Sequence, residues 1–288
     1  MRVLVTGVGG QVGRALVSSA PATVEIIGCS HADLDITDAS SVMSRIRRHE
    51  PDVIVNAAAY TAVDRAESEP EKAHCANADG PRFLASTARE IGARLVHIST
   101  DFVFDGTSSV PYKPGDKTNP QNVYGLTKRA GEQAVLETYA AGSVIVRTAW
   151  VYAPLGSNFV LTMLRILRAN GVARVVSDQI GTPTSAPSLA GALWKVVSMP
   201  ELSGIHHWTD AGVASWYDFA VAIAEQAAEL GLLSRDVTVT PIATQEYPTP
   251  ARRPAYSVLD KTSLVQRGVV PIHWRTGLGR VLKEIPRA

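Results

Sequence analysis

The feature of this sequence that most constrains its fold is a glycine-rich loop near the N-terminus. An apolar run over residues 3–6 leads into three glycines spaced three apart, Gly7, Gly10 and Gly13, and apolar residues at helical spacing follow at once. A tight turn from strand to helix needs a residue that can adopt positive φ, and the backbone can approach a pyrophosphate only where no Cβ intervenes. The N–H groups at the helix N-terminus then face the phosphates. We interpret the loop as a dinucleotide-binding turn, with a plain tight turn as the alternative.

Short apolar runs alternate with helical patterns through the first half of the chain. The runs are apolar on both faces, which is typical of a parallel sheet covered by helices on both sides. We expect strands at residues 3–6, 24–28, 53–55, 94–99 and 143–147, and helices at residues 39–48, 71–91 and 123–139. The pattern predicts a doubly wound α/β fold of the Rossmann type, with a dinucleotide-binding domain over residues 1–150.

The pattern becomes less regular after Trp150. Four prolines within residues 241–254 favour an ordered irregular loop. We expect residues 151–288 to form mostly a smaller C-terminal substrate-binding domain. Its expected helices cover residues 159–169, 189–197 and 215–230, and strands near 174–177 and 204–208 could rejoin the first sheet.

The charge and cysteine content bear on partners and compartment. Twenty-eight Lys and Arg residues against 27 Asp and Glu residues give a net charge of +1, whereas binding to nucleic acid or to an anionic membrane needs a concentrated basic face. Cys29 and Cys75 form no CxxC pair, so neither a disulfide framework nor a zinc site is indicated. We find no signal-peptide pattern and no apolar stretch of about 20 residues. We therefore expect a cytoplasmic protein with no nucleic-acid or membrane partner.

The residues after the second expected strand bear on the choice between NADPH and NADH. An Asp or Glu that binds the adenosine ribose is common at this point in NAD-dependent domains, but no acid occurs here before Asp33. A 2′-phosphate would therefore not be repelled, and Arg14, Ser30 or His31 could help to hold one. The pattern favours NADPH, with NADH as the alternative.

Two further segments are candidates for cofactor contacts. Asp35 and Ile36 could lie on the adenine side, although a plain helix-entry turn fits this segment equally well. The third expected strand is followed by the small residues Ala58 and Ala59. Small side chains let a flat cofactor lie against the backbone at the carboxyl edge of the sheet, where ligands of such sheets bind. Close packing is the alternative reading of the alanines.

A Tyr-x-x-x-Lys pattern near the start of a helix suggests a catalytic pair. Tyr124 and Lys128 are four residues apart and therefore face the same way. A nearby ammonium favours the phenolate and would lower the pKa of Tyr124 from about 10, tuning it for proton transfer near neutral pH. Ser99, Thr100 and Asp101 end the preceding strand at the same edge of the sheet, where a hydroxyl could bind a substrate carbonyl. A chance Tyr and Lys on an exposed helix is the alternative.

These motifs resemble those of the extended short-chain dehydrogenase/reductases, and longer segments are similar to the dTDP-4-dehydrorhamnose reductase family. The similar segments follow one another in order along nearly the whole chain, which makes the resemblance more specific than any single motif. They are Gly10-Gln11-Val12-Gly13, Asn56-Ala57-Ala58-Ala59-Tyr60-Thr61-Ala62-Val63-Asp64 with Ala66-Glu67-Ser68, Ser99-Thr100-Asp101-Phe102-Val103-Phe104-Asp105-Gly106, Arg147-Thr148-Ala149-Trp150-Val151-Tyr152, Asp178-Gln179-Ile180-Gly181-Thr182-Pro183-Thr184 and Pro248-Thr249-Pro250-Ala251-Arg252-Arg253-Pro254.

The resemblance implies a reductase that delivers hydride from NADPH to C4 of dTDP-6-deoxy-L-lyxo-4-hexulose and yields dTDP-L-rhamnose. Tyr124 would donate the proton, Lys128 would tune it and hold the nicotinamide ribose, and Thr100 would polarise the C4 carbonyl. Asp101 and Trp150 would contact the sugar nucleotide. Besides this pair, the cofactor would be lined by Gly7, Gly10, Gln11, Val12, Gly13, Asp35, Ile36, Ala58, Ala59, Tyr60 and Thr61.

Two positions depart from the family pattern. Phe102 stands where members often carry Tyr, so a hydroxyl near the substrate is lost. Some members bind Mg²⁺ across a dimer interface through a carboxylate two positions after the third glycine, where this chain has Ala15. We therefore expect no metal and no Mg²⁺-bridged dimer, with a monomer as the default. Arg253, beside Arg252 in the proline-rich loop, suits a pyrophosphate by its charge and fork geometry, with a solvated side chain as the alternative.

Two other functions remain open from the sequence. A sibling enzyme could reduce the 4-keto group of another nucleotide-linked 6-deoxysugar, because sugar stereochemistry is read by few contacts. A non-catalytic regulatory subunit could keep the same fold, although intact Tyr124, Lys128 and Thr100 argue against it.

Overall fold

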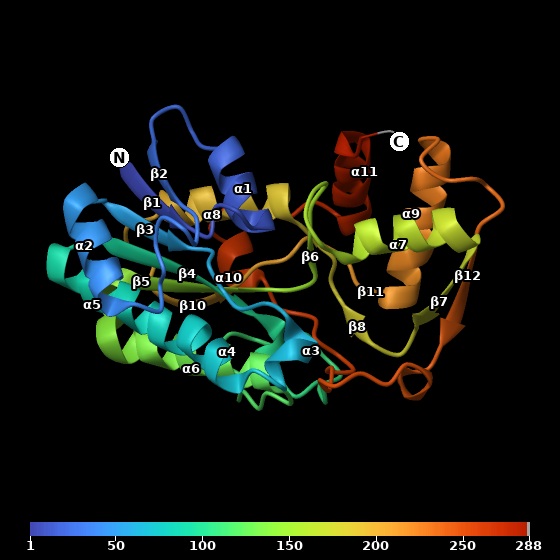
Figure 1. Cartoon of the computed structure of the whole chain (residues 1–288), viewed down its shortest axis with the longest axis horizontal. Helices are drawn as coiled ribbons and strands as arrows, with labels where there is room; N and C mark the ends of the chain where they lie inside the picture. The colour runs from blue at the N-terminus through green and yellow to red at the C-terminus, as the bar shows by residue number, and fades with distance from the viewer. Residues whose placement is uncertain (287–288) are drawn as a thin grey trace.

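A six-stranded parallel sheet carries the N-terminal half of the chain (Figure 1). The computed structural model describes residues 1–286, and the strand order in this sheet is β10-β5-β4-β3-β1-β2. The order reverses between β1 and β3, which is the point where doubly wound sheets bind ligands. The strands are β1 (Arg2–Thr6), β2 (Glu25–Cys29), β3 (Val53–Asn56), β4 (Arg94–Thr100), β5 (Ser143–Thr148) and β10 (Gly204–His207).

Helices cover both faces of the sheet (Figure 1). Val3 and Val5 of β1 pack with α1 and α8 on one face, whereas Leu4 packs with α2 and α5 on the other. This alternation buries both faces of each strand, and the doubly wound α/β fold predicted from the sequence is confirmed. The helices of these two layers are α1 (Gln11–Ser18) and α8 (Ala186–Val197) on one side, and α2 (Ala39–His49), α5 (Gly80–Ile91) and α6 (Val123–Tyr139) on the other.

The start of α6 is fixed by its cap and by close packing. The Asn122 side chain accepts a hydrogen bond from the backbone N–H of Gly125 at 2.8 Å, which satisfies an orphan donor of the first turn. Gly125 itself lies so close to the Phe102 carbonyl that a Cβ would collide with it. The first turn of α6, which carries Tyr124, is therefore locked onto the segment that follows β4.

The helix expected over residues 71–91 differs from the prediction because a π-helical turn interrupts it. Asn77, in this turn, is fully buried, and its amide pairs with both the N–H and the carbonyl of Tyr60 and with the Thr127 hydroxyl. The wider turn thus ties the loop after β3 to α6. The helical segments are α4 (Pro70–His74), the π-helical turn Cys75–Asp79 and α5; the short α3 (Val63–Ala66) precedes them.

A second lobe has its own hydrophobic core, built around Phe219 and Trp274 (Figure 1). Of the two later strands that could rejoin the main sheet, β10 does so beside β5, whereas β7 pairs with β12 at the outer edge of the second lobe. The strand β12 enters the segment expected to be irregular, and Pro241 is tolerated there because β12 is an edge strand. The elements of this half are β6 (Val151–Tyr152), α7 (Phe159–Asn170), β7 (Val172–Val176), β8 (Ile180–Gly181), β9 (Thr184–Ser185), β11 (Ala214–Ser215), α9 (Trp216–Glu229), β12 (Thr238–Ile242), α10 (Thr262–Val265) and α11 (Trp274–Glu284).

Candidate active site

A cavity of about 680 Å³ lies at the carboxyl ends of the central strands and reaches the second lobe. Its walls come from the glycine loop after β1, the loop after β3, the ends of β4 and β5, the start of α6, and Trp216 at the start of α9. Most residues singled out in the sequence lie on this one surface: Gly7, Gly10, Gln11, Val12, Asp35, Ile36, Ala58, Ala59, Thr61, Thr100, Asp101, Tyr124, Lys128, Trp150 and Arg253.

The glycine loop has the geometry that its spacing predicts. Gly7 has φ of +68°, and a Cβ there would come within 2.7 Å of the Ala58 backbone nitrogen. The Gly10 N–H closes the turn onto the Gly7 carbonyl at 2.9 Å, and α1 begins at the next residue. The helix N-terminus therefore faces the cavity with unpaired N–H groups, as a phosphate site requires.

Two residues expected to line the cofactor lie outside the cavity wall. Gly13 packs against Gly7, where a Cβ would collide with the Gly7 carbonyl, so its role is to let α1 approach β1. The Tyr60 side chain turns away and donates a hydrogen bond from its hydroxyl to Glu69 at 2.6 Å. Glu69, the acceptor of this hydrogen bond, lies nine residues further along the chain and was not considered in the sequence analysis.

The segment after β2 offers few groups to the adenosine end of the cavity. Asp33 is engaged locally, because its carboxylate accepts hydrogen bonds from the Ser30 N–H at 2.9 Å and hydroxyl at 2.6 Å. Arg14 donates instead to the Gly9 carbonyl at 3.0 Å. Of the three residues that could hold a 2′-phosphate, only His31 lines the cavity. Asp35 also lines it.

Thr100 and Tyr124 converge at the end of β4. The Thr100 hydroxyl donates to Asp101 Oδ1 at 3.0 Å and also interacts with the Tyr124 phenol. Phe102 packs edge-on against the Tyr124 ring, with centroids 5.6 Å apart. Burial raises the pKa of Tyr124 to about 12, so the lowering predicted from Lys128 is wrong here. Burial likewise raises the pKa of Asp101 to about 6.

Lys128 is almost fully buried and is held against β4. Its ammonium group donates to the Ile98 carbonyl at 2.7 Å and lies 3.5 Å from Nε2 of His97. Burial lowers the pKa of Lys128 to about 8, while the charge of Glu132, one helical turn further along α6, acts in the opposite direction. The amine therefore lines the cavity beside Tyr124 with two neighbours that the sequence did not reveal.

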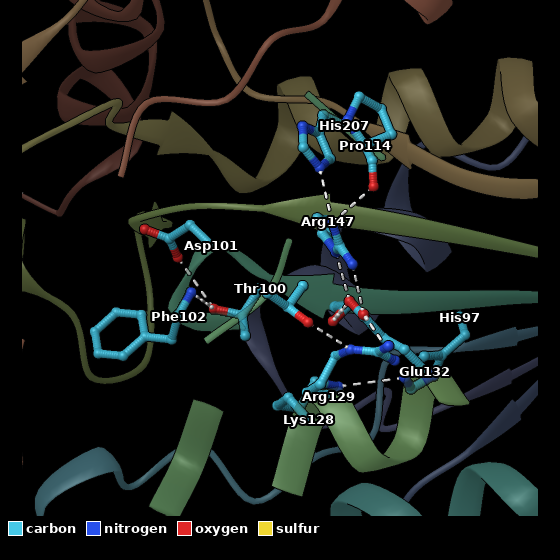
Figure 2. A network of polar contacts seen from close by, with 12 residues as sticks. His97, Thr100, Asp101, Phe102, Pro114, Lys128, Arg129, Glu132, Arg147 and His207 are labelled. Atoms are coloured by element: carbon cyan, nitrogen blue, oxygen red, sulfur yellow. Dashed lines mark hydrogen bonds and ion pairs between the residues drawn. The ribbon is translucent and has the colours of Figure 1, made fainter. Parts of the chain in front are cut away.

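A buried ion pair fixes the rest of α6 to the sheet. Glu132 accepts two hydrogen bonds from Arg147 of β5, each at 2.7 Å, and a third from the Ser99 hydroxyl at 2.6 Å. Figure 2 shows Arg147 between Glu132 on one side and Pro114 and His207 on the other. Both members of the pair are shielded from solvent. The network joins α6, both central strands and the loop after β4 directly behind the Thr100–Tyr124 wall.

Two tryptophans form the wall that faces the second lobe. Trp150 follows β5 and has φ of +49°, a conformation rare for a bulky residue. Its indole lies flat on that of Trp216, with ring centroids 3.5 Å apart. Trp216 was missed from the sequence, which indicated only that a helix begins near residue 215.

Arg253 lines the cavity but has a carboxylate partner. Its two terminal nitrogens contact the carboxylate oxygens of Asp64 at 3.0 and 2.8 Å, in a fork-like pair. Nη1 also donates to the Thr249 hydroxyl at 2.6 Å. The pair joins the proline-rich loop to α3, and the charge available for a pyrophosphate is reduced accordingly.

Neither a metal cluster nor a membrane helix is found over residues 1–286. No group of three or more His, Cys, Asp and Glu side chains in this part of the chain is placed to hold a metal ion. Ala15 lies on the buried face of α1, with 8% of its surface exposed. None of the helices described there is long and apolar enough to cross a membrane.

A glycine loop and a Tyr-x-x-x-Lys pair that meet on one cavity are the arrangement of the extended short-chain dehydrogenase/reductases, and the chain is an oxidoreductase of this class. It belongs to the RmlD substrate binding domain family, whose model matches residues 1–287.

Curated and structural relatives agree with this assignment. The chain is 40% identical to the dTDP-4-dehydrorhamnose reductase of Escherichia coli K12, over 99% of this chain and 98% of the relative. It is 43% identical to the spore coat polysaccharide biosynthesis protein SpsK of Bacillus subtilis, over 98% of this chain and 97% of the relative. Its fold is similar to that of a dTDP-4-dehydrorhamnose reductase from Clostridium acetobutylicum, with a TM-score of 0.93 and 41% identity over 98% of this chain and 99% of that one. It is also similar to the dTDP-4-dehydrorhamnose reductase of Bacillus anthracis in complex with NADP. The TM-score is 0.92 and the sequence identity is 36%, over 98% of this chain and 99% of that one.

Proposed function

We propose that the chain reduces the C4 keto group of dTDP-4-dehydro-L-rhamnose to give dTDP-L-rhamnose, with NADPH as the reductant. The observation that carries the proposal is that Thr100 and Tyr124 line the same cavity as the glycine loop. Two hydroxyls placed in this way can bind one carbonyl oxygen and stabilise the charge that develops on it. Relatives such as the E. coli enzyme are named dTDP-4-dehydrorhamnose reductase, after this reaction.

The residues present fit a dinucleotide. The approach of Gly7 to Ala58 leaves no room for a side chain at Gly7, and the start of α1 supplies N–H donors for a pyrophosphate. Asp33 is held by Ser30, and His31 is the basic group on the wall at this end, which favours NADPH over NADH. The B. anthracis relative, with 36% identity, is described in complex with NADP. When bound, NADPH supplies the hydride for C4.

The roles of the chain's own residues follow from their positions and pKa values. Tyr124 is protonated at neutral pH, and burial raises its pKa further, so it carries a proton that it can donate to the C4 oxygen. The Thr100 hydroxyl donates to Asp101 in this structure, and it would turn the same proton toward the C4 oxygen when the sugar binds. Lys128 faces the same cavity and would hold the nicotinamide ribose, where its positive charge favours the phenolate left on Tyr124.

The proposal is tested with purified protein, NADPH and a panel of nucleotide-linked 4-ketosugars, by following the loss of absorbance at the nicotinamide band. We expect the highest kcat/KM with dTDP-4-dehydro-L-rhamnose. A sibling activity on another 4-ketosugar is the second candidate, because SpsK, at 43% identity, is named for spore coat polysaccharide synthesis. Equal rates with several sugars, or no oxidation with any of them, would remove the first assignment.

The role of Tyr124 is tested by Tyr124→Phe, which keeps the ring and removes the proton donor. We expect kcat to fall by about 10²-fold or more. Tyr139→Phe, at the far end of the same helix, is the matched control and should leave kcat unchanged. Near wild-type turnover of Tyr124→Phe would place the proton donor elsewhere.

We also propose that the chain works without an Mg²⁺-bridged dimer, because Ala15 offers no ligand. Addition of EDTA should leave both the hydrodynamic size and the NADPH oxidation rate unchanged. Dissociation of a dimer on chelation would overturn this inference.

A further inference from the structure

Three polar residues form a row across the central strands and lead to Lys128. Thr6, Asn56 and His97 lie in register on β1, β3 and β4, where the neighbouring residues of these strands are apolar. Thr6 donates its hydroxyl proton to Asn56 Oδ1 at 2.6 Å, and Asn56 Nδ2 lies 3.0 Å from Nδ1 of His97. All of them are at most 1% exposed. Buried polar groups at such positions are costly unless they are paired, so the row has to be satisfied internally.

The row fixes the tautomer of His97. The backbone N–H of Ala58 can only donate, and it lies 3.2 Å from both Asn56 Oδ1 and the Thr6 hydroxyl oxygen. The Thr6 hydroxyl in turn donates to Asn56 Oδ1 at 2.6 Å, so this atom receives two donors and is assigned as the oxygen. Asn56 Nδ2, which can only donate, therefore faces Nδ1 of His97, so Nδ1 must accept. His97 is then neutral and carries its proton on Nε2. That N–H faces the Lys128 amine at 3.5 Å.

A fixed donor opposite Lys128 disfavours the ammonium form. An ammonium has three donors and no acceptor, whereas a neutral amine can accept from the His97 N–H and still donate to the Ile98 carbonyl. We propose that His97 is a positioning residue that controls the charge of Lys128 by holding an N–H donor against its amine.

Other charged and titratable groups also lie around the amine. Glu132 on α6 favours the ammonium, but its carboxylate is neutralised by Arg147 of β5. Tyr124 is on the same helix, and Asp101, after β4, interacts with Tyr124. Burial lowers the pKa of Lys128 to about 8 and that of His97 well below its usual value, in agreement with a neutral ring. Lys128 is thereby brought into a range where it gains or loses a proton near neutral pH.

The tautomer is tested first on the wild-type protein without substrate. A long-range ¹H–¹⁵N correlation spectrum of the seven histidines, with His97 assigned by its absence from His97→Gln, distinguishes the two neutral tautomers. We expect a proton on Nε2 of His97 and none on Nδ1. This protonation state should stay the same between about pH 6 and 9, a range that brackets the titration of Lys128. A proton on Nδ1, or a charged ring, would overturn the inference whether or not the protein reduces a sugar.

The charge of Lys128 is tested next by ¹⁵N detection of its amine across the same pH range. In His97→Gln the amide can turn its oxygen toward Lys128 and accept from the ammonium, so the titration should move up by about one pH unit or more. His206→Gln changes another buried histidine, on β10, whose ring pairs with Ser263 and Ser203. It should leave the titration of Lys128 where it is in the wild type. An unchanged titration in His97→Gln would contradict the proposal.

The kinetic consequence rests on the proposed reductase function. If the ammonium form of Lys128 is the active one, the alkaline limb of the kcat/KM profile should move with the amine titration in His97→Gln. A purely structural role of His97 would lower kcat/KM equally at all pH values, and that result would overturn the proposal. The spectra of the wild-type protein remain informative if the sugar is not reduced, so the two proposals fail separately.

Discussion

The indole of Trp150 lies on the indole of Trp216 with their planes 4° apart, which joins the end of β5 to the second lobe across the cavity. The backbone of Trp150 is in the left-handed region, and Gly181 leaves the space that the Trp150 ring occupies in this conformation. A Cβ at residue 181 would approach the Trp150 indole to within 2.5 Å. Trp150, the residue expected to contact the sugar, therefore depends for its orientation on Trp216, a residue with no apparent signal in the sequence.

Removing this support should weaken sugar binding more than chemistry. A stacked aromatic pair contributes about 0.5–1.5 kcal/mol beyond its buried area, so Trp216→Ala should raise KM for the sugar nucleotide by about tenfold and change kcat less. Trp216→Phe keeps a ring for Trp150 and should stay close to the wild type. Steady-state kinetics at saturating NADPH provide the measurement. An unchanged KM in Trp216→Ala would show that Trp150 holds its orientation alone.

The glycine loop offers a matched pair of substitutions. Gly7→Ala would force an L-residue to φ of +68° and press its Cβ against the Ala58 backbone. We expect a loss of about 1–3 kcal/mol in the free energy of unfolding, together with weaker NADPH binding. Gly9→Ala, two residues away, meets no atom within 4 Å and should change stability by about 0.5 kcal/mol at most. Urea unfolding and NADPH titration test both variants, and equal behaviour of the two would contradict the role assigned to Gly7.

The ion pair behind the site should be costly to break. Glu132→Gln leaves the Arg147 guanidinium buried without its counter-charge, which typically destabilises a protein by about 3–5 kcal/mol. The exposed pair of Arg275 and Glu225 is the control, since both side chains are about half exposed. Glu225→Gln should therefore change the free energy of unfolding by about 1 kcal/mol or less. Similar losses in the two variants, measured by urea denaturation, would argue against a structural role for the buried pair.

Asp101 should make the protein less stable as the pH rises. Its pKa is about 6 in the fold against 3.8 for a free Asp side chain, so the folded state binds more protons between these values and the free energy of unfolding falls across this window. The expected loss is about 3 kcal/mol, complete above pH 6. Asp101→Asn should remove this loss, and so be more stable than the wild type at pH 7.5, yet less active. Unfolding curves at pH 5 and 7.5 test the sign; a wild type more stable at pH 7.5 would contradict it.

The sequence predicted what depends on local spacing. The glycines of the loop and the four-residue interval between Tyr124 and Lys128 are periodic features of the sequence. The alternation of strands and helices then predicts a doubly wound parallel sheet. These features are encoded within a few residues of one another, so they can be recognised without tertiary information.

What the sequence did not predict depends on contacts between distant segments. The direction of the pKa shift of Tyr124 was wrong because burial raises the pKa, and the charge of Asp101 acts in the same direction. His97 is one polar residue in an apolar strand, and only the register of three strands shows that it meets Asn56 and Lys128. Asp64, the partner of Arg253, is 189 residues away along the chain. Neither spacing nor composition contains that information.

The most direct test of the proposed reaction is to follow one hydride. NADPH that carries deuterium at the transferred position of the nicotinamide is incubated with the protein and dTDP-4-dehydro-L-rhamnose, and the product is examined by NMR and mass spectrometry. The convergence of Thr100 and Tyr124 on one carbonyl predicts dTDP-L-rhamnose with a single deuterium at C4 of the sugar. Deuterium at another carbon, formation of the C4 epimer, or full retention of the label in the cofactor would contradict it.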